Sequence, residues 1–513
     1  MLTTLLLLPF AGALAVLLIP ANYRVILRLV ALITTGVTVL QALSVFSAMQ
    51  PEVTGFQLVE QAAWIPSAGF NYHVGVDGLN IGLTLLTSLV AFAAVCVSWD
   101  IEKQTKLYYF CLLLITGGAM GAFLSLDMFF LYFFNEVALV PTFLMMGIWG
   151  RGEKKLYATY QMALYLTLGA MLALVGLAIL YTASGANSLD IVTLNAWLAQ
   201  HPLSASSQRL LFPLFLFGFG TLVGLWPFHS WAAPGYAAAP PATAMLHAGV
   251  LKKVGLYALI RVALPLMPDG VRTWMPVLAV LCLGNILYCG WLALRQRDLA
   301  LLLGNSSLAH MGFCFLGLAS VSVTGITGVV VILVAHGLLA ALNYALVGHV
   351  VRAAGTSNLD KLGGLLRPMP VIGFFVVLAF MAGCGMPGFA NFPGELGVLF
   401  GAWNRLPLIV IFSAWGGLLI GGIYMLRAIR SLLHGPVPAG LEASSDAGSG
   451  IALYWRSLPY AVLLVPLVFF GISPDTLVRR IEPAVIPIVK AAAASVAPTV
   501  ETKSPSLTSL SPR

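Results

Sequence analysis

The chain has 513 residues, of which 60% are hydrophobic and only 9% are charged, and its formal net charge is +8. Because soluble domains carry roughly 25% charged residues, this composition excludes an ordinary soluble protein and indicates an integral membrane protein. The basic residues lie in short segments between long apolar runs, so their surplus gives no reason to expect a nucleic-acid partner.

Apolar runs long enough to cross a bilayer recur along the chain, and we expect about fourteen membrane spans in an all-α polytopic fold. The first run lacks a basic start and an A-x-A cleavage site, so we interpret it as a retained span rather than a signal peptide. The predicted helices cover residues 2–20, 25–48, 77–99, 107–125, 128–149, 156–182, 209–226 (continuing brokenly to about 240), 243–264, 273–294, 298–321, 324–351, 369–401 (with a break), 406–432 and 453–472.

Three further segments are not expected to span the membrane. Residues 51–72 include an amphipathic piece that we expect at a membrane interface. Residues 473–492 are predicted to form a short amphipathic helix, opened by Ser473, Pro474 and Asp475. From Ala493 the tail is rich in serine, threonine and proline, which predicts disorder.

Basic residues alternate between the connections. Because basic loops remain in the cytoplasm, this pattern predicts a periplasmic N-terminus, with Arg479 and Arg480 as an exception. The intervening connections offer little beyond Arg209, Arg272 and Arg405. The basic connections hold Arg24 and Arg28; Lys103 and Lys106; Arg151, Lys154 and Lys155; Arg295 and Arg297; Arg352, Lys361 and Arg367; and Arg427 and Arg430.

Proline and glycine interrupt the seventh and the twelfth predicted spans. One break begins at Pro227, and the other runs from Met386 to Gly394 and contains Pro387 and Pro393. Interrupted helices at corresponding positions point to inverted repeats with a site in each half. We therefore expect helices 4–8 and 9–13 to be two inverted five-helix repeats. The expected organisation is 1–106 (first three helices and interfacial segment), 107–266 (first repeat), 267–433 (second repeat), 434–492 (last span and amphipathic helix) and 493–513 (disordered tail).

Four ionisable residues lie in apolar spans, where charge is costly and functional use is the default interpretation. Glu136 is a lone carboxylate in the fifth span, and an interhelical hydrogen bond is the alternative explanation. Lys252 and Lys253 are adjacent, so on a helix they point about 100° apart, and one of them could instead pair locally. Glu395 follows the second break, where we expect water to reach it.

Histidines and cysteines complete the set of reactive side chains. His310 and His336 lie mid-span beside small residues and are candidates for proton relay, and His229 lies in the first break. No two histidines have metal-ligand spacing with a carboxylate, and the six cysteines show no CxxC pattern, so we expect no metal site and no iron–sulfur cluster. A broken helix beside buried ionisable groups favours ion translocation.

Five stretches carry a resemblance to a known family. They are VGVDGLN, NEVALVPTFLMMGIWG, WPFHSWAAPGYAAAPPATAMLHAGVLKKVGLYALIR, NSSLAHMGF and MPGFANFPGE. They resemble the antiporter-like subunits of respiratory complex I over residues from about 70 to 430, and they are also similar to sodium–proton antiporter subunits. By this resemblance, Glu136 matches the family's helix-5 glutamate, Lys253 its helix-8 lysine and Glu395 its helix-12 ionisable residue. His310 and His336 match the histidines of its SHMG and SHG patterns.

The chain departs from the family at one position, because Leu222 stands where the family has a lysine on broken helix 7. We expect Lys252 to point into the bundle near Leu222 and Glu136 and to replace part of the lost charge. Lys253 would then face the second half of the chain and Glu395.

The resemblance implies a proton-translocating membrane subunit of an NADH–quinone oxidoreductase in a bacterial inner membrane. Its partners would be neighbouring antiporter-like subunits, lipid and protons. It would hold no cofactor, and redox energy would arrive from other subunits. The alternatives are a membrane subunit of a sodium–proton antiporter or bicarbonate-uptake complex, and a structural subunit that has lost ion transport.

Overall fold

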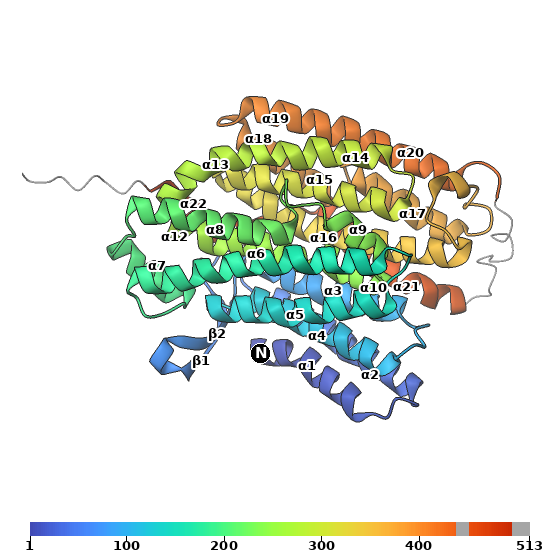
Figure 1. Cartoon of the computed structure of the whole chain (residues 1–513), viewed down its shortest axis with the longest axis horizontal. Helices are drawn as coiled ribbons and strands as arrows, with labels where there is room; N and C mark the ends of the chain where they lie inside the picture. The colour runs from blue at the N-terminus through green and yellow to red at the C-terminus, as the bar shows by residue number, and fades with distance from the viewer. Residues whose placement is uncertain (438–450, 495–513) are drawn as a thin grey trace, which may run out of the picture.

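The computed structural model describes residues 1–437 and 451–494, which form a bundle of helices that run roughly along the long axis of the molecule (Figure 1). The predicted disordered tail lies almost entirely outside these residues. Ten of the described helices are long and apolar enough to cross a membrane by length and composition. The chain is therefore a predominantly helical, multi-pass membrane protein.

The helices agree with the predicted spans to within a few residues over most of the chain. The first half contains α1 (Leu2–Leu18), α2 (Arg24–Ala48), α3 (Ile81–Val97), α4 (Thr105–Leu124), α5 (Met128–Trp149), α6 (Lys155–Ser184), α7 (Ile191–Gln200), α8 (Ala205–Val223), α9 (Ala232–Ala238), α10 (Pro241–Leu246), α11 (Lys252–Ala258) and α12 (Leu264–Leu266). The second half contains α13 (Pro268–Leu283), α14 (Gly290–Arg295), α15 (Leu299–Ser320), α16 (Val323–Ala354), α17 (Pro370–Gly383), α18 (Asn391–Trp403), α19 (Pro407–Ala414), α20 (Gly421–Leu433), α21 (Ile451–Ile472) and α22 (Asp475–Ala493).

The number of spans and the inverted repeats stay predictions. Beyond the ten long helices, the further spans would have to come from the shorter apolar helices α1, α3 and α17 and from the interrupted stretch from α10 to α12. The amphipathic helix predicted at 473–492 is confirmed as α22. The short α7 was not predicted, because ten residues are too few to give a spanning signal.

The centre of the bundle is formed by α15 and α16. The most apolar 18-residue window is 100% buried in α16 and 94% buried in α15, whereas it is only 33% buried in α6. Each helix starts at a polar cap, since Asp298 accepts a hydrogen bond from Leu301 N (2.9 Å) and Ser322 accepts one from Gly325 N (3.0 Å). Several polar side chains on these two helices, among them His310 and His336, are therefore buried inside the bundle.

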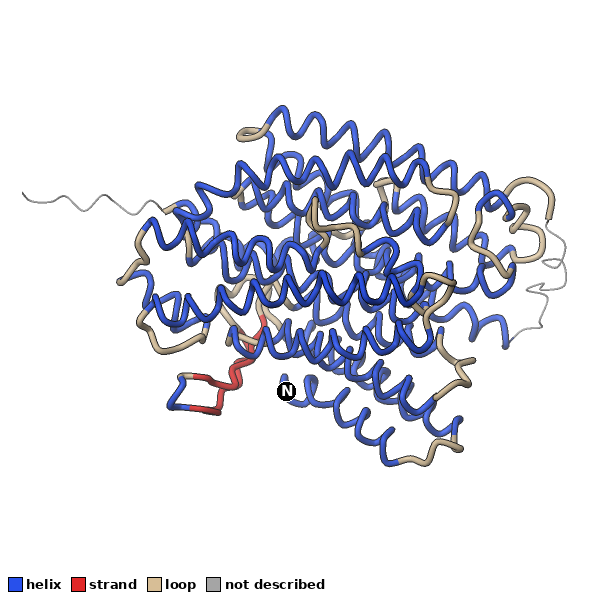
Figure 2. Tube along the Cα trace, viewed as in Figure 1, coloured by secondary structure: helices blue, strands red, loops and turns tan. Residues whose placement is uncertain are grey.

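The predicted amphipathic piece contains a β-hairpin, and its position at a membrane interface stays a prediction. Strands β1 (Gln57–Ile65) and β2 (Phe70–Val76) pair antiparallel and project from one end of the bundle (Figure 2). The chain turns through Gly69, which has a left-handed φ of 68°. β2 becomes fully buried toward Val76, whereas Trp64 on β1 remains exposed. One strand is largely exposed and the other is largely buried, which explains why the sequence of this segment is amphipathic.

Both predicted helix breaks are confirmed. The first separates α8 from α9 and begins at Gly224, whose φ of 90° only glycine adopts readily. The second separates α17 from α18 and contains Gly385 and Gly388, with φ of 70° and 97°. The predicted helix at 243–264 also contains two π-helical turns, η2 (His247–Leu251) and η3 (Leu259–Ala263). Such turns are frequent at functional sites, and η2 directly precedes the two lysines.

Candidate functional site

Four of the sequence-predicted residues form a continuous row in the centre of the bundle. Lys253 Nζ lies 3.0 Å from His336 Nδ1, and His310 Nδ1 lies 3.0 Å from Glu395 Oε1. The two imidazole rings are neighbours, with centroids 5.5 Å apart. All four side chains are buried, with exposed fractions of 8% or less. The row Lys253–His336–His310–Glu395 thus joins the two halves of the chain.

Each member of the row comes from a different helix. Lys253 is on α11, His336 on α16, His310 on α15 and Glu395 on α18, and α16 packs against both α15 and α18. The second break shapes the Glu395 end, because a Cβ on Gly385 would lie 2.7 Å from Glu395 Oε2. Only glycine allows the broken backbone to approach the carboxylate this closely. The prediction that water reaches Glu395 remains a prediction, since the side chain is buried inside this chain.

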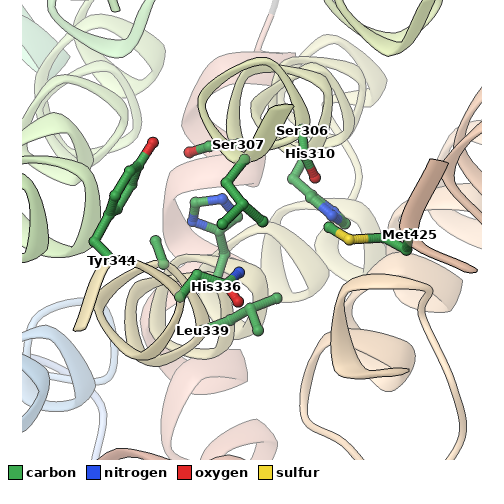
Figure 3. Close-up of a pocket in the computed structure, with 10 residues that line it drawn as sticks. Ser306, Ser307, His310, His336, Leu339, Tyr344 and Met425 are labelled. Atoms are coloured by element: carbon green, nitrogen blue, oxygen red, sulfur yellow. The ribbon is translucent and has the colours of Figure 1, made fainter. Parts of the chain in front are cut away.

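A small cavity adjoins the two histidines (Figure 3). Its space of about 10 Å³ is roughly what a single water molecule needs. Both polar and apolar side chains line the cavity. The lining residues are Leu303, Ser306, Ser307, His310, His336, Leu339, Ala340, Asn343, Tyr344 and Met425. Of the row, only the two imidazoles line this space, and imidazoles can accept and donate protons near neutral pH.

Lys252 points into the bundle, as predicted, but in another direction. Its Nζ donates to Ser307 Oγ and to Ser307 O (3.4 Å) on α15, and it lies 5.7 Å from the centre of the Tyr236 ring. The described hydrogen bonds of Lys252 both go to Ser307, and that of Glu136 comes from Asn135, so none joins Lys252 to Glu136. Because Lys252 and Lys253 leave the helix about 100° apart, one reaches Ser307 while the other reaches His336.

Glu136 and His229 are not part of the row. Glu136 is half-buried on α5, and its one described hydrogen bond comes from Asn135 Nδ2 at 3.2 Å. Leu222 is 5% exposed, so an apolar side chain occupies the place where the resemblance predicts a lysine. His229 lies in the first break and packs edge-on against Tyr288. The structure therefore brings together Lys253, His336, His310 and Glu395. It leaves Glu136 without a cationic partner among the described residues.

Sequence reasoning missed the residue that fixes the first break. Asn285 accepts a hydrogen bond from Trp226 N at 2.8 Å and donates one to Gly224 O at 2.8 Å. Asn285 thereby satisfies two backbone groups that the interrupted helix leaves unpaired. A lone amide in an apolar span was the available signal.

A buried ion pair was also missed, although both partners lie in stretches that carry the resemblance. Arg261 donates to both carboxylate oxygens of Asp77, at 2.7 and 2.5 Å. The guanidinium also donates to Tyr257 Oη at 3.3 Å and lies over the Phe56 ring at 4.9 Å. Bidentate pairing of this kind fixes geometry as well as charge. The pair ties the end of the hairpin to the helix that carries the lysines.

A second polar cluster attaches the hairpin near the start of α5, outside the spans. His73 pairs with Asp190, and Asn71 N donates to Asp127 Oδ2 at 3.2 Å. Burial, reinforced by the neighbouring Asp190, raises the pKa of Asp127 to about 6. Burial would also raise the pKa of Asp190, but hydrogen bonds from His73 and Thr193 outweigh it and hold that pKa below its ordinary value.

The side chains of the types that can ligate a metal do not form a cluster among the described residues. Within residues 1–437 and 451–494, no group of three or more His, Cys, Asp and Glu side chains could hold a metal ion. The six cysteines are free and scattered through the helices.

Comparison with known proteins places this geometry in context. Residues 125–421 match the family described as NADH:quinone oxidoreductase/Mrp antiporter, TM. The chain is 31% identical over 471 residues to NADH-quinone oxidoreductase subunit M of Rhodobacter capsulatus, covering 90% of each protein. It superimposes with a TM-score of 0.87 on a chain of respiratory complex I from Thermus thermophilus with bound NADH, at 26% identity, covering 96% of this chain and 100% of that one. A chain of the Mrp complex from a Dietzia species shares the fold, with a TM-score of 0.81, 20% identity, and coverage of 96% and 99%.

Proposed function

The chain belongs to the NADH:quinone oxidoreductase/Mrp antiporter transmembrane family, and we propose that it is a proton-translocating membrane-arm subunit of a respiratory NADH–quinone oxidoreductase. The observation that carries the proposal is the buried row Lys253–His336–His310–Glu395. Buried ionisable groups in a membrane protein mark ion pathways, and histidine exchanges protons near neutral pH.

In this role the chain moves protons while other subunits carry out electron transfer. A proton held by Lys253 passes to Nδ1 of His336, crosses to His310 and reaches Glu395 beside the second break. In this proposal the chain carries no redox centre of its own, and a change in a neighbouring subunit alters the proton affinity of the row. The partners are then other membrane-arm subunits, and the location is a bacterial inner membrane with a periplasmic N-terminus. Segments 107–266 and 267–433 would act as the two antiporter-like repeats.

One alternative rests on specific residues. Leu222 replaces the expected cation, and Glu136 has no ion pair among the described residues, which favours a subunit whose first half is not conducting. A structural subunit without proton transport is the extreme form of this alternative. The intact row, which runs from Lys253 in the first half to Glu395 in the second, argues against it, because a buried carboxylate, lysine and two histidines are costly to retain without a use.

The test is proton pumping by the assembled complex in sealed vesicles. Glu395→Gln keeps the shape of the side chain but removes its exchangeable carboxyl proton, so we expect fewer protons pumped per electron while the complex still assembles. The matched control is Glu102→Gln, since Glu102 is an exposed carboxylate whose side chain is 77% accessible. Normal pumping by Glu395→Gln would remove this residue from the pathway.

A further inference from the structure

Lys252 has surroundings that the row does not use. The side chain is fully buried, and it reaches across to Ser307 on α15, a residue that also lines the cavity beside His310 and His336. The other titratable groups around it are Lys253, His247, His336, Tyr236, Cys289 and Cys314. Among the described residues, the hydrogen bonds of the two lysines go to Ser307, Ala248 and His336, and neither lysine has a carboxylate partner.

Two adjacent buried ammonium groups without a carboxylate repel each other strongly. Both side chains are fully buried on consecutive residues, where little water screens this repulsion. Interacting groups of this kind titrate as a pair rather than singly. The lysine pair therefore holds one positive charge more readily than two, and a proton that arrives at one lysine favours release from the other.

Three buried polar side-chain atoms without hydrogen-bond partners in the described part of the chain lie between Lys252 and the end of the bundle that carries the basic loops. Tyr236 Oη, Tyr344 Oη and Asn343 Oδ1 are buried and have no hydrogen-bond partner among the described residues. The Tyr236 and Tyr344 rings are neighbours, with centroids 5.6 Å apart, and Tyr344 and Asn343 line the cavity (Figure 3). Buried polar atoms without protein partners are commonly satisfied by water.

The tyrosines lie close to the basic end. Tyr236 is on α9, which ends at Ala238, and Arg151 N donates a hydrogen bond to Ala238 O. Tyr344 is four residues, or about 6 Å along the helix, from Gly348, which faces Pro241 at the start of α10. The polar atoms thus extend from the loop at Arg151 inward to Ser307 and Lys252.

We propose that Lys252 is the proton-uptake residue of this chain, which receives protons from the basic end through water held by Tyr236, Tyr344 and Asn343. An O–H bond of that water breaks as an N–H bond forms at Lys252 Nζ, and the water regains a proton from the basic end. The added charge drives the proton of Lys253 onto Nδ1 of His336, and Lys252 then passes its proton to Lys253 through water, so that one proton enters the row for each one passed on. The inference rests on the proposed function, and it assigns to a lysine on α11 the uptake role for which Leu222 is unsuited.

The test separates proton exchange from a fixed charge. Lys252→Met removes the exchangeable proton, whereas Lys252→Arg keeps the positive charge but cannot release a proton near neutral pH. In the assembled complex we expect both variants to lower the pumping rate by roughly 100-fold, the size typical of losing a positioned proton-transfer group. Lys361→Met, at an exposed lysine near the basic end, is the matched control and should pump normally.

Each other result has a defined meaning. Normal pumping by Lys252→Met assigns Lys252 to packing, and normal pumping by Lys252→Arg assigns it a fixed charge; either overturns the inference. If neither variant assembles, Ser307→Ala and Tyr344→Phe decide, since each removes one oxygen, and unchanged pumping in both overturns it. Lys253→Met distinguishes the two proposals. If Lys253→Met also pumps normally, the proposed function fails. If Lys253→Met loses pumping while Lys252→Met pumps normally, only the uptake role of Lys252 fails.

Discussion

Breaking the buried pair between Asp77 and Arg261 should destabilise the chain far more than breaking a surface pair. Asp77→Asn keeps the size of the side chain but leaves the guanidinium, which is 4% exposed, without a compensating charge. Removing one partner of a buried ion pair costs about 3–5 kcal/mol. We expect a loss of about 3 kcal/mol in the free energy of unfolding, because Tyr257 and the Phe56 ring still contact Arg261.

A double-mutant cycle tests the physical reason. Arg261→Met in the Asp77→Asn background removes the unpaired charge, so the double variant should lose less than the sum of the two single variants. The assay is SDS titration of the detergent-purified protein, followed by its helical signal. The control is Asp100→Asn, which breaks the exposed pair with Arg352 and should cost less than about 1 kcal/mol. Equal losses for Asp77→Asn and Asp100→Asn, or additive losses in the cycle, would refute the reasoning.

Three further outcomes can be checked independently. Glu136→Gln should lower the proton-to-electron ratio of an intact complex because it removes a carboxyl proton at membrane depth, and a normal ratio would assign Glu136 to packing. A cysteine at Gly152 should react with an impermeant reagent only from the cytoplasmic side, and labelling from outside intact cells would reverse the topology. Because the pKa of Asp127 is raised to about 6, the folded state binds its proton more tightly than the unfolded state does; the stability it contributes is therefore present at low pH and lost as pH rises through 6. The detergent-purified protein should consequently unfold at a lower SDS concentration at pH 8 than at pH 5, and this difference should be smaller in Asp127→Asn.

The helical part of the fold could be predicted because lipid imposes one requirement on every span. Apolar length defines α5 to the residue, and proline and glycine mark both breaks at Pro227 and Pro387. The hairpin could not be predicted because β1 and β2 are short and only partly buried. The alternation of their apolar and polar residues resembles that of an amphipathic helix or coil. Its attachment depends on Asp77, Asp127 and Asp190 meeting partners far along the chain.

The site was predictable in its members but not in its connections. Buried charge is conspicuous in an apolar sequence, which is why Lys253, His310, His336 and Glu395 could be named. Which lysine faces which helix depends on the rotation of α11 after the π-helical turn η2, and no sequence pattern reports that rotation. Lys252 was therefore expected near Leu222, whereas its hydrogen bond goes to Ser307.

The central claim is that protons cross the chain through the row that begins at Lys253. Lys253→Met tests it most directly, because the substitution keeps an unbranched side chain but removes the group that contacts His336 Nδ1 at 3.0 Å. The measurement is the number of protons pumped per electron during NADH oxidation by the assembled complex in sealed vesicles. The account predicts a lowered ratio in Lys253→Met and an unchanged ratio in Lys361→Met. A wild-type ratio in Lys253→Met, with the variant chain present in full amount, would contradict it.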